Sequence, residues 1–369
     1  MSDFKYQSYE EFDDTENLTY PDFYYPWNEA LEEGINPGFL DADTLIMLLD
    51  IYYEDHDKYG LKDSIPYMLK FHPDNIDLIE EILYYLNEFE DWFDLYRLTE
   101  QYLHLKDTAY PQIYKLSAML HLGMEEEAFH SFRQLKKEYK NDKENLPLIY
   151  QIMGDALNEI QHHEAALQIA NEALITIGLR TEFYWIQLSA YMSLEETEDA
   201  IRLAEKIEKL SPLDKNTWFE LGKAYIELQK LDKAIDAFEF TITLGGKSID
   251  LFMNLIRMYE ANGNDMKALE TAKTAIEIRP DYHDMFLMAI HISMRLGLFT
   301  EVLETIDKAL VIDTEIKDVL YMYKGEAFIE MEEYKKAIVA LERGIEETGD
   351  ERGFLTKQLE KLREQFPYL

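Results

Sequence analysis

The sequence contains no cysteine and has few basic residues for its length. The absence of cysteine from all 369 residues excludes disulfides, thiolate nucleophiles and thiolate metal sites, and favours a reducing, cytoplasmic compartment. Only 36 lysines and arginines stand against 74 acidic residues, so the net charge is −38. Nucleic acids and anionic membrane surfaces are therefore not expected partners, because both attract proteins through clustered basic side chains.

Long apolar segments are also absent. No run of residues approaches the 18 or so consecutive apolar positions that a membrane-spanning helix requires. The first residues, MSDFKYQSYEEFDD, do not combine a basic start with an apolar stretch, so we expect no secretory signal. The 47% apolar content is nevertheless enough for a sizeable buried core, which indicates a folded protein.

Sequence patterns typical of catalytic, metal-binding or phosphate-binding sites are scarce. The sequence has no glycine-rich phosphate loop, and its one local cluster of histidine and glutamate, His162 to Glu164, falls in a turn between two expected helices. His283 and His291 are eight residues apart, more than two helical turns, which is too far for one metal ion. We therefore expect no enzymatic activity, no cofactor and no metal site.

A repeating pattern is present instead. Aromatic residues recur every 34 positions at Tyr150, Tyr184, Trp218, Phe252 and Phe286. Small residues recur at the same interval, at Ala166, Ala200, Ala234 and Ala268. Apolar residues at helical spacing occupy both halves of each period, which predicts a pair of amphipathic helices per repeat. A single helix pair cannot cover its own apolar face, so the pairs must stack.

One of these repeats resembles a known family. The residues that carry the resemblance are Trp218, Leu221, Gly222, Tyr225, Ala234 and Phe238. This spacing is similar to the tetratricopeptide-repeat (TPR) signature, which has the same period. The resemblance implies an all-α, right-handed superhelical solenoid of about nine helical hairpins plus a C-terminal capping helix. It also implies a surface for protein or peptide partners rather than a reaction.

The repeats divide the chain into four regions. Residues 1–41 form an acidic, aromatic-rich N-terminal arm, and residues 42–146 hold three degenerate repeats with starts near Ala42, Ile76 and Tyr110. Residues 147–351 hold six clear repeats, and residues 352–369 form the capping helix. In the arm, Tyr24, Tyr25 and Trp27 are expected to cover the first repeat.

In the resembling family the first helix of each hairpin lines a concave groove. Three successive first helices here carry Lys223, Arg257 and His291 at one structural level, a set we call the basic ladder. One turn earlier lies the apolar ladder, which comprises Trp185, Phe219, Met253, Leu287 and Met322. Asn254 and Arg295 add hydrogen-bond donors nearby. Two alternatives stay open: the apolar ladder belongs to the core, and Lys223 and Arg257 pair with nearby glutamates such as Glu220, Glu227 and Glu260.

These patterns predict a non-enzymatic interaction scaffold. Its groove would bind an acidic partner with aromatic or aliphatic anchors, because the two ladders complement such a segment. One alternative is a self-associating or autoinhibited protein, including a homodimer, in which the acidic and aromatic residues Phe4 to Glu16 fill the groove. Another alternative is a peptide-sensing regulatory protein.

Overall fold

The computed structural model describes residues 20–280, 282–312, 316–350, 353–366 and 368, which form helices and no strand. Contacts divide the chain into an N-terminal unit, Thr19–Ser211, and a C-terminal unit that includes Pro212–Leu369. The helices of the N-terminal unit are α1 (Tyr24–Glu32), α2 (Ala42–Glu54), α3 (Lys58–Phe71), α4 (Ile76–Glu88), α5 (Trp92–Tyr102), α6 (Tyr110–His121), α7 (Glu125–Glu138), α8 (Asn145–Glu159), α9 (His163–Thr176), α10 (Thr181–Ser193) and α11 (Thr197–Leu210).

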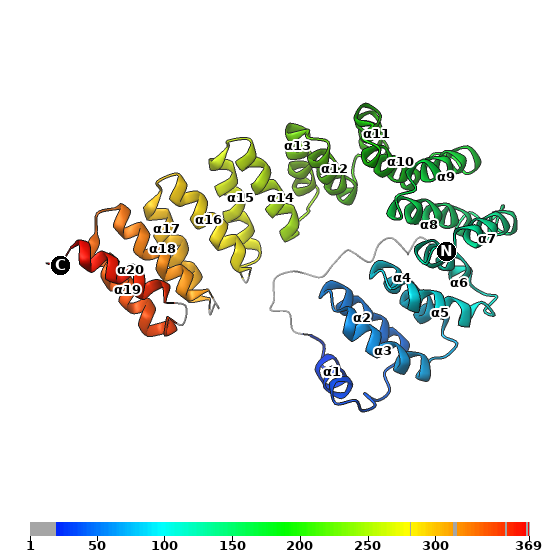
Figure 1. The fold of residues 1–369 in the computed structure, drawn as a ribbon, viewed down its shortest axis with the longest axis horizontal. Coiled ribbons are helices and arrows are strands. Elements are labelled where there is room, and N and C mark those ends of the chain that lie inside the picture. The colour runs from blue at the N-terminus through cyan, green and yellow to red at the C-terminus, as the bar shows by residue number, and fades with distance from the viewer. Residues whose placement is uncertain (1–19, 281, 313–315, 351–352, 367, 369) are drawn as a thin grey trace. The chain divides into compact units, whose positions relative to one another are not determined.

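The helices of the C-terminal unit are α12 (Lys215–Glu227), α13 (Leu231–Thr243), α14 (Ile249–Ala261), α15 (Asp265–Ile278), α16 (His283–Arg295), α17 (Phe299–Val311), α18 (Lys317–Glu330), α19 (Tyr334–Thr348) and α20 (Phe354–Gln365). From α2 to α19 the described helices pair into nine successive hairpins, each made of an even-numbered and the following odd-numbered helix (Figure 1). The predicted all-α fold class of repeated helical hairpins is confirmed. The four-region division of the chain stays a prediction.

The helix starts follow the repeat register of the sequence. Helices α10, α12, α14 and α16 begin at Thr181, Lys215, Ile249 and His283, which are spaced by 34 residues. The weaker early repeats behave in the same way, since α2, α4 and α6 begin at the predicted starts Ala42, Ile76 and Tyr110. The register therefore extends through both the degenerate and the clear repeats.

The turn inside each hairpin contains one residue with left-handed backbone geometry. Glycine holds this position at Gly123, Gly263 and Gly297, with φ between 69° and 77°. Six other hairpins use a larger residue with φ between 55° and 65°: His56, Glu90, Gln161, Glu195, Gln229 and Glu332. A left-handed residue ends the first helix and reverses the chain within three residues. The shared turn geometry explains why the hairpins keep one sequence register although their turn sequences differ.

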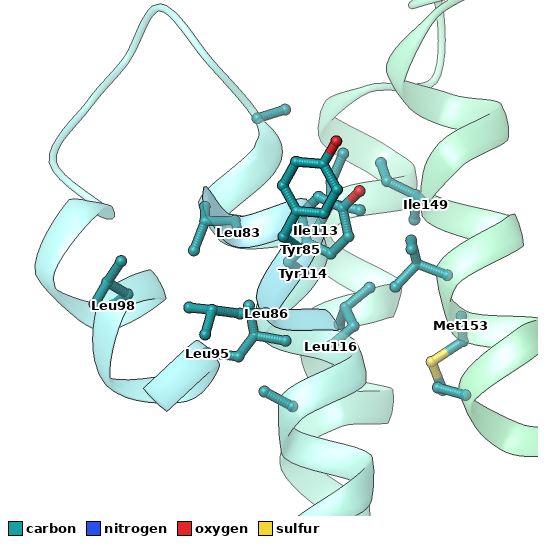
Figure 2. Close-up of a cluster of buried hydrophobic side chains, with 14 of the residues drawn as sticks. Leu83, Tyr85, Leu86, Leu95, Leu98, Ile113, Tyr114, Leu116, Ile149 and Met153 are labelled. Carbon is teal, nitrogen blue, oxygen red and sulfur yellow. The ribbon is translucent and has the colours of Figure 1, made fainter. Parts of the chain in front are cut away.

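Buried side chains from successive first helices form the core of the N-terminal unit. Figure 2 shows Leu86 of α4, Leu116 of α6 and Met153 of α8 in one continuous cluster. All three side chains are fully buried. Leu95 and Leu98 of α5 close the same cluster from the second-helix side. The core is thus shared between hairpins, as expected for units that cannot bury an apolar face alone.

Helix α1 covers the start of the N-terminal unit. Its Trp27 is buried, with 1% of its surface exposed, and the indole Nε1 donates to Ser64 Oγ of α3 at 2.9 Å. Ser64 Oγ also lies 2.9 Å from the Tyr52 hydroxyl, which donates to Asn28 Oδ1 at 2.7 Å. The expectation that Trp27 covers the first repeat is confirmed, whereas Tyr25 is 57% exposed and does not contribute in this way.

The C-terminal unit ends in the predicted capping helix. Leu355, Leu359 and Leu362 of α20 are buried in a cluster with Tyr321 of α18 and Leu341 of α19. The opposite side of α20 carries exposed charged residues. The helix therefore covers the apolar face that the last hairpin would otherwise present to water.

Candidate functional site

The basic ladder occupies three successive first helices of the C-terminal unit. Lys223 lies on α12, Arg257 on α14 and His291 on α16, and all three side chains are exposed. Of the ten predicted binding residues, only Trp185 lies in the N-terminal unit, on α10. The remaining nine residues belong to α12, α14, α16 and α18, the helices described next.

Side-chain caps fix the starts of two ladder helices. Asp214 accepts hydrogen bonds from the backbone nitrogens of Asn216 and Thr217 at the start of α12. Ser248 accepts from the Leu251 nitrogen at the start of α14. Each cap satisfies an otherwise unpaired helical N–H group. Because both helices begin at the same repeat position, Lys223 and Arg257 occupy equivalent places one repeat apart.

Lys223 is already engaged within its own helix. Its Nζ lies 2.7 Å from Glu220 Oε1 and 5.1 Å from the centre of the Phe219 ring. Both side chains of the ion pair are nearly half exposed, so the pair contributes little to folding stability. A partner carboxylate can therefore compete for Lys223 at low cost.

Arg257 differs from the other two members of the ladder. Its guanidinium has no ion-pair partner among the described residues, although α14 also carries Glu260 one turn away. Glu260 instead pairs with Arg295, at 2.6 Å between Oε1 and Nη2. Asn254, three residues before Arg257 on the same helix face, is half-buried and likewise forms no hydrogen bond with the described side chains. Arg257 and Asn254 are thus open donors at the middle of the ladder.

His291 is linked to the next hairpin. Its Nε2 is hydrogen-bonded to the Tyr323 hydroxyl of α18, and the two rings meet edge to face with centres 5.1 Å apart. The ladder stops at α18, where the equivalent residue is Glu326. Burial and the nearby charge of Glu330 raise the pKa of Glu326. Basic residues therefore occupy this repeat position on α12, α14 and α16 but not on α18.

Arg295 has a structural partner. It bridges from the end of α16 to Asp265 of α15 and Glu260 of α14, with contacts of 2.6 to 3.1 Å. Three hydrogen bonds to two carboxylates hold the guanidinium in place. Arg295 therefore joins hairpins and is not an open donor for a partner.

The apolar ladder is half-buried along its length. Leu287 packs on the core cluster that contains Phe286 and Ile290, and Met322 packs on the cluster around Leu341. The Phe219 ring lies 5.9 Å from that of Phe238. One side of each of these side chains therefore packs against the core, and the other side remains partly exposed to solvent.

Sequence reasoning did not single out a charged cluster in the N-terminal unit. It consists of Glu88, His121, Asp155 and Glu159, and we call it the carboxylate junction. Glu88, His121 and Glu159 are the last residues of α4, α6 and α8. The 34-residue register that located the basic ladder could have found it, since Asp155 is two repeats before Lys223.

The described residues contain no group of three or more histidine, aspartate or glutamate side chains placed to hold a metal ion. His162 lies 3.7 Å from Glu125, and His163 contacts Asn158. No helix in the same described ranges is long and apolar enough to cross a membrane.

Comparison with known proteins places this repeat architecture in a family. The family model of the ChAPs (Chs5p-Arf1p-binding proteins) matches residues 50–240, just over half of the chain. The chain belongs to the ChAPs family. This ChAPs-family chain is also 30% identical over 126 residues to the TPR repeat-containing protein YpiA of Bacillus subtilis (strain 168). That match covers 34% of the chain and spans 30% of the length of YpiA.

Solved TPR structures resemble the ChAPs-family chain more distantly. A tetratricopeptide repeat protein from Parabacteroides merdae ATCC 43184 has 18% identity and a TM-score of 0.39, and the match covers 68% of this chain and 96% of that one. YrrB, described as a TPR protein with an unusual peptide-binding site, has 20% identity and a TM-score of 0.36, with 53% and 97% covered. The resemblance of the sequence to the TPR family is confirmed by the named relative and the repeated hairpins.

Proposed function

We propose that this protein is a non-enzymatic scaffold whose basic ladder binds an acidic peptide segment of a partner protein. The observation that carries the proposal is the state of Arg257. It is an exposed cation without an ion-pair partner among the described residues, in a chain with 74 acidic residues. A carboxylate that meets this guanidinium forms charge-assisted hydrogen bonds that the protein itself does not supply.

The residues around Arg257 favour a peptide over a small anion. Lys223 and His291 extend the positive character by one repeat on either side, which suits a segment with several carboxylates. Half-buried Phe219, Met253 and Leu287 lie one turn before the three ladder residues and offer apolar contact for aromatic or aliphatic anchors. Methionine adapts to side chains of different shape, so we propose a groove that accepts related sequences.

The absence of cysteine supports a reducing, cytoplasmic location as part of the same proposal. Residues 4–16 of the chain itself have the composition that the ladder would recognise, with four aromatic and five acidic side chains: Phe4, Tyr6, Tyr9, Glu10, Glu11, Phe12, Asp13, Asp14 and Glu16. They lie outside the described residues. Self-association or autoinhibition by this segment remains the alternative function.

A displayed library of random 12-residue peptides tests the proposal. We expect selection on the full chain to enrich peptides that combine acidic and aromatic residues. Arg257→Glu should weaken binding of the selected peptides by about tenfold or more, since a hydrogen bond to a charged group contributes about 1.5–3 kcal/mol. The matched control is Lys335→Glu, which reverses an exposed cation on the second helix α19 and should leave affinity within the measurement error.

Three results distinguish the proposal from its alternatives. Enrichment of neutral or basic peptides, or equal affinities for the wild-type and Arg257→Glu proteins, contradicts the proposal. Deletion of residues 1–19 that raises peptide affinity supports occupation of the groove by this segment. A molecular mass that doubles with concentration and halves on the same deletion assigns the segment to a second copy of the chain.

A further inference from the structure

Arg257 lacks an ion-pair partner among the described residues because the glutamate nearest to it along α14 is engaged elsewhere. Glu260 lies three residues after Arg257, a spacing at which side chains on one helix face can pair. The Glu260 Oε1 atom instead lies 2.6 Å from Nη2 of Arg295, at the end of α16. The carboxylate that could neutralise Arg257 is therefore held by an arginine of the next hairpin.

Asp265 fixes Arg295 in the position from which it reaches Glu260. The Arg295 Nε donates to Asp265 Oδ2 at 3.1 Å, and Nη2 donates to Oδ1 at 2.8 Å. Asp265 begins α15, directly after the short turn that follows α14 (Figure 1). The carboxyl side chains of Glu260 and Asp265 are 30% and 26% exposed. Because these charges are partly shielded from solvent, their attraction to Arg295 is screened less than in a fully exposed pair.

Lys223 shows the other arrangement at the same ladder position. Lys223 and Glu220 are also three residues apart, and Nζ lies 2.7 Å from Oε1. In the described part of the chain, Glu220 pairs with no second cation. One repeat before Arg295 the residue is Ala261, so the α12 hairpin has no counterpart of the bridge. A ladder cation thus pairs within its own helix when no other hairpin engages the neighbouring glutamate.

An arginine that precedes its glutamate on a helix can form such a pair. Arg343 and Glu347 of α19 have this order, and Nε lies 2.6 Å from Oε1 across four residues. Arg257 and Glu260 have the same order across three residues, a spacing that also brings side chains together. Glu260 released from its bridge is therefore close enough along α14 to pair with Arg257.

We propose that Arg295 is a positioning residue for the peptide site, a role that rests on the proposed function of the basic ladder. Arg295 holds Glu260 away from Arg257 and so keeps the Arg257 guanidinium available to a partner carboxylate. The Nε and Nη2 donors of Arg295 are used by Asp265 and Glu260, so Arg295 acts through Arg257. The bridge between α14, α15 and α16 therefore sets how much positive charge the middle of the ladder offers.

Chemical labelling of the full chain tests this role without a peptide. Phenylglyoxal modifies arginine side chains, and a paired carboxylate slows the reaction because it stabilises the charged guanidinium. Mass spectrometry follows Arg257, with Arg202, which pairs with Asp199 on α11, as the internal reference. We expect Arg295→Gln to slow the labelling of Arg257 by about two- to fivefold, and Glu260→Gln in that background to restore the rate.

Binding of the tightest acidic peptide from the display selection should follow the labelling. Arg295→Gln should weaken binding by about two- to fivefold, because the peptide carboxylate must displace Glu260 from Arg257. Glu260→Gln in the same background should restore the affinity. Asp265→Asn in that background removes an equal charge but leaves Glu260 in place, so the affinity should stay low.

Two single substitutions form a matched comparison within the ladder. Glu220→Gln frees Lys223 from its pair and should raise peptide affinity by about twofold. Glu260→Gln in the wild-type chain should change the affinity less, because Arg295 already holds Glu260 away from the ladder. A general effect of removing one negative charge would make the two substitutions act alike.

The positioning role of Arg295 is refuted if Arg257 is labelled at the same rate in the wild type and in Arg295→Gln. It is also refuted if Asp265→Asn restores peptide affinity as well as Glu260→Gln does. Restoration by Glu260→Gln alone supports it. A display selection that yields no acidic peptide contradicts the proposed function of the ladder, whereas the labelling rates still decide whether Arg295 keeps Arg257 unpaired.

Discussion

Arg295 and Asp265 form a two-point ion pair between neighbouring hairpins. Arg295 Nε donates to Asp265 Oδ2 at 3.1 Å, and Nη2 donates to Oδ1 at 2.8 Å. The same guanidinium reaches Glu260 on α14 at 2.6 Å. A planar guanidinium fits a carboxylate in this geometry better than a lysine ammonium could. The pair therefore fixes the end of α16 against α14 and α15.

Loss of this bridge should destabilise the C-terminal unit and release Glu260 next to Arg257 of the basic ladder. Arg295→Gln is expected to lower the free energy of unfolding by about 1 kcal/mol, because the bridge is a network but its arginine is half exposed. Urea unfolding followed by circular dichroism measures the change. Affinity for acidic peptides should also fall, because Glu260, released from Arg295, can pair with Arg257 one turn away on α14.

A control variant separates the bridge from a generic charge effect. Arg343 pairs with Glu347 within α19, and Arg343→Gln removes the same charge from an exposed pair four residues apart. Such pairs contribute about 0.2–0.5 kcal/mol, so this variant should lie closer to the wild type. Equal destabilisation by both substitutions contradicts the structural role of Arg295.

Asp142 accepts hydrogen bonds at the start of α8 that should make the stability of the protein depend on acid pH. Its Oδ1 accepts from the backbone nitrogens of Glu144 and Asn145, each at 2.9 Å, just before α8 begins. Its Oδ2 accepts from Asn145 Nδ2 at the same distance. Hydrogen bonds from the Asn145 backbone and side chain lower the pKa of Asp142 below its ordinary value. The ionised form is therefore favoured in the folded protein.

The stabilisation by Asp142 should be present above about pH 4 and disappear as the pH falls through the lowered pKa. Asp142→Ala should cost about 1 kcal/mol at pH 7, the usual value for a lost capping side chain. Asp142→Asn retains an acceptor but cannot titrate, so it should resemble the wild type at pH 7. Urea unfolding at pH 7 and pH 3 measures this. If the difference between wild type and Asp142→Asn is the same at both pH values, the prediction fails.

The sequence was sufficient to predict the fold because the repeat imposes its register on local structure. Tyr184, Trp218 and Phe252 recur at one helix position, and α10, α12 and α14 begin at the expected residues. Exposed ladder residues were also predictable from the register. Their pairing was not, because it depends on side-chain choices within a turn: Lys223 pairs with Glu220, as one alternative allowed, whereas Glu260 pairs with Arg295 and leaves Arg257 open.

The carboxylate junction was harder to predict for a different physical reason. Asp155 and Glu159 share a helix face, which the sequence shows, but Glu88 and His121 approach them from α4 and α6. Only the packing of three first helices brings these ends together. The rotation of each helix then decides whether like charges meet. A repeat register alone gives the positions along the helices but not the distances between side chains.

Gly297 and Gly222 are required for different reasons, the first by its left-handed backbone geometry and the second by close packing. Gly297, in the turn before α17, has φ of 71° and open space where a Cβ would lie. Gly222 of α12 has helical geometry, but a Cβ there would lie 2.4 Å from Cε1 of the buried Phe238 ring. Gly297→Ala should cost about 1–2 kcal/mol through the left-handed backbone alone. Gly222→Ala should cost about 1–3 kcal/mol by overpacking, despite the better helix propensity of alanine.

A second substitution distinguishes the two causes. Phe238→Leu in the Gly222→Ala background makes room for the new methyl group, so the double variant should be more stable than the sum of the single changes predicts. The same Phe238→Leu change should be additive with Gly297→Ala, because nothing packs within 4 Å of a Cβ at Gly297. Urea unfolding of the five variants measures both cycles. Additivity at Gly222 would show that the glycine is not required by the Phe238 ring.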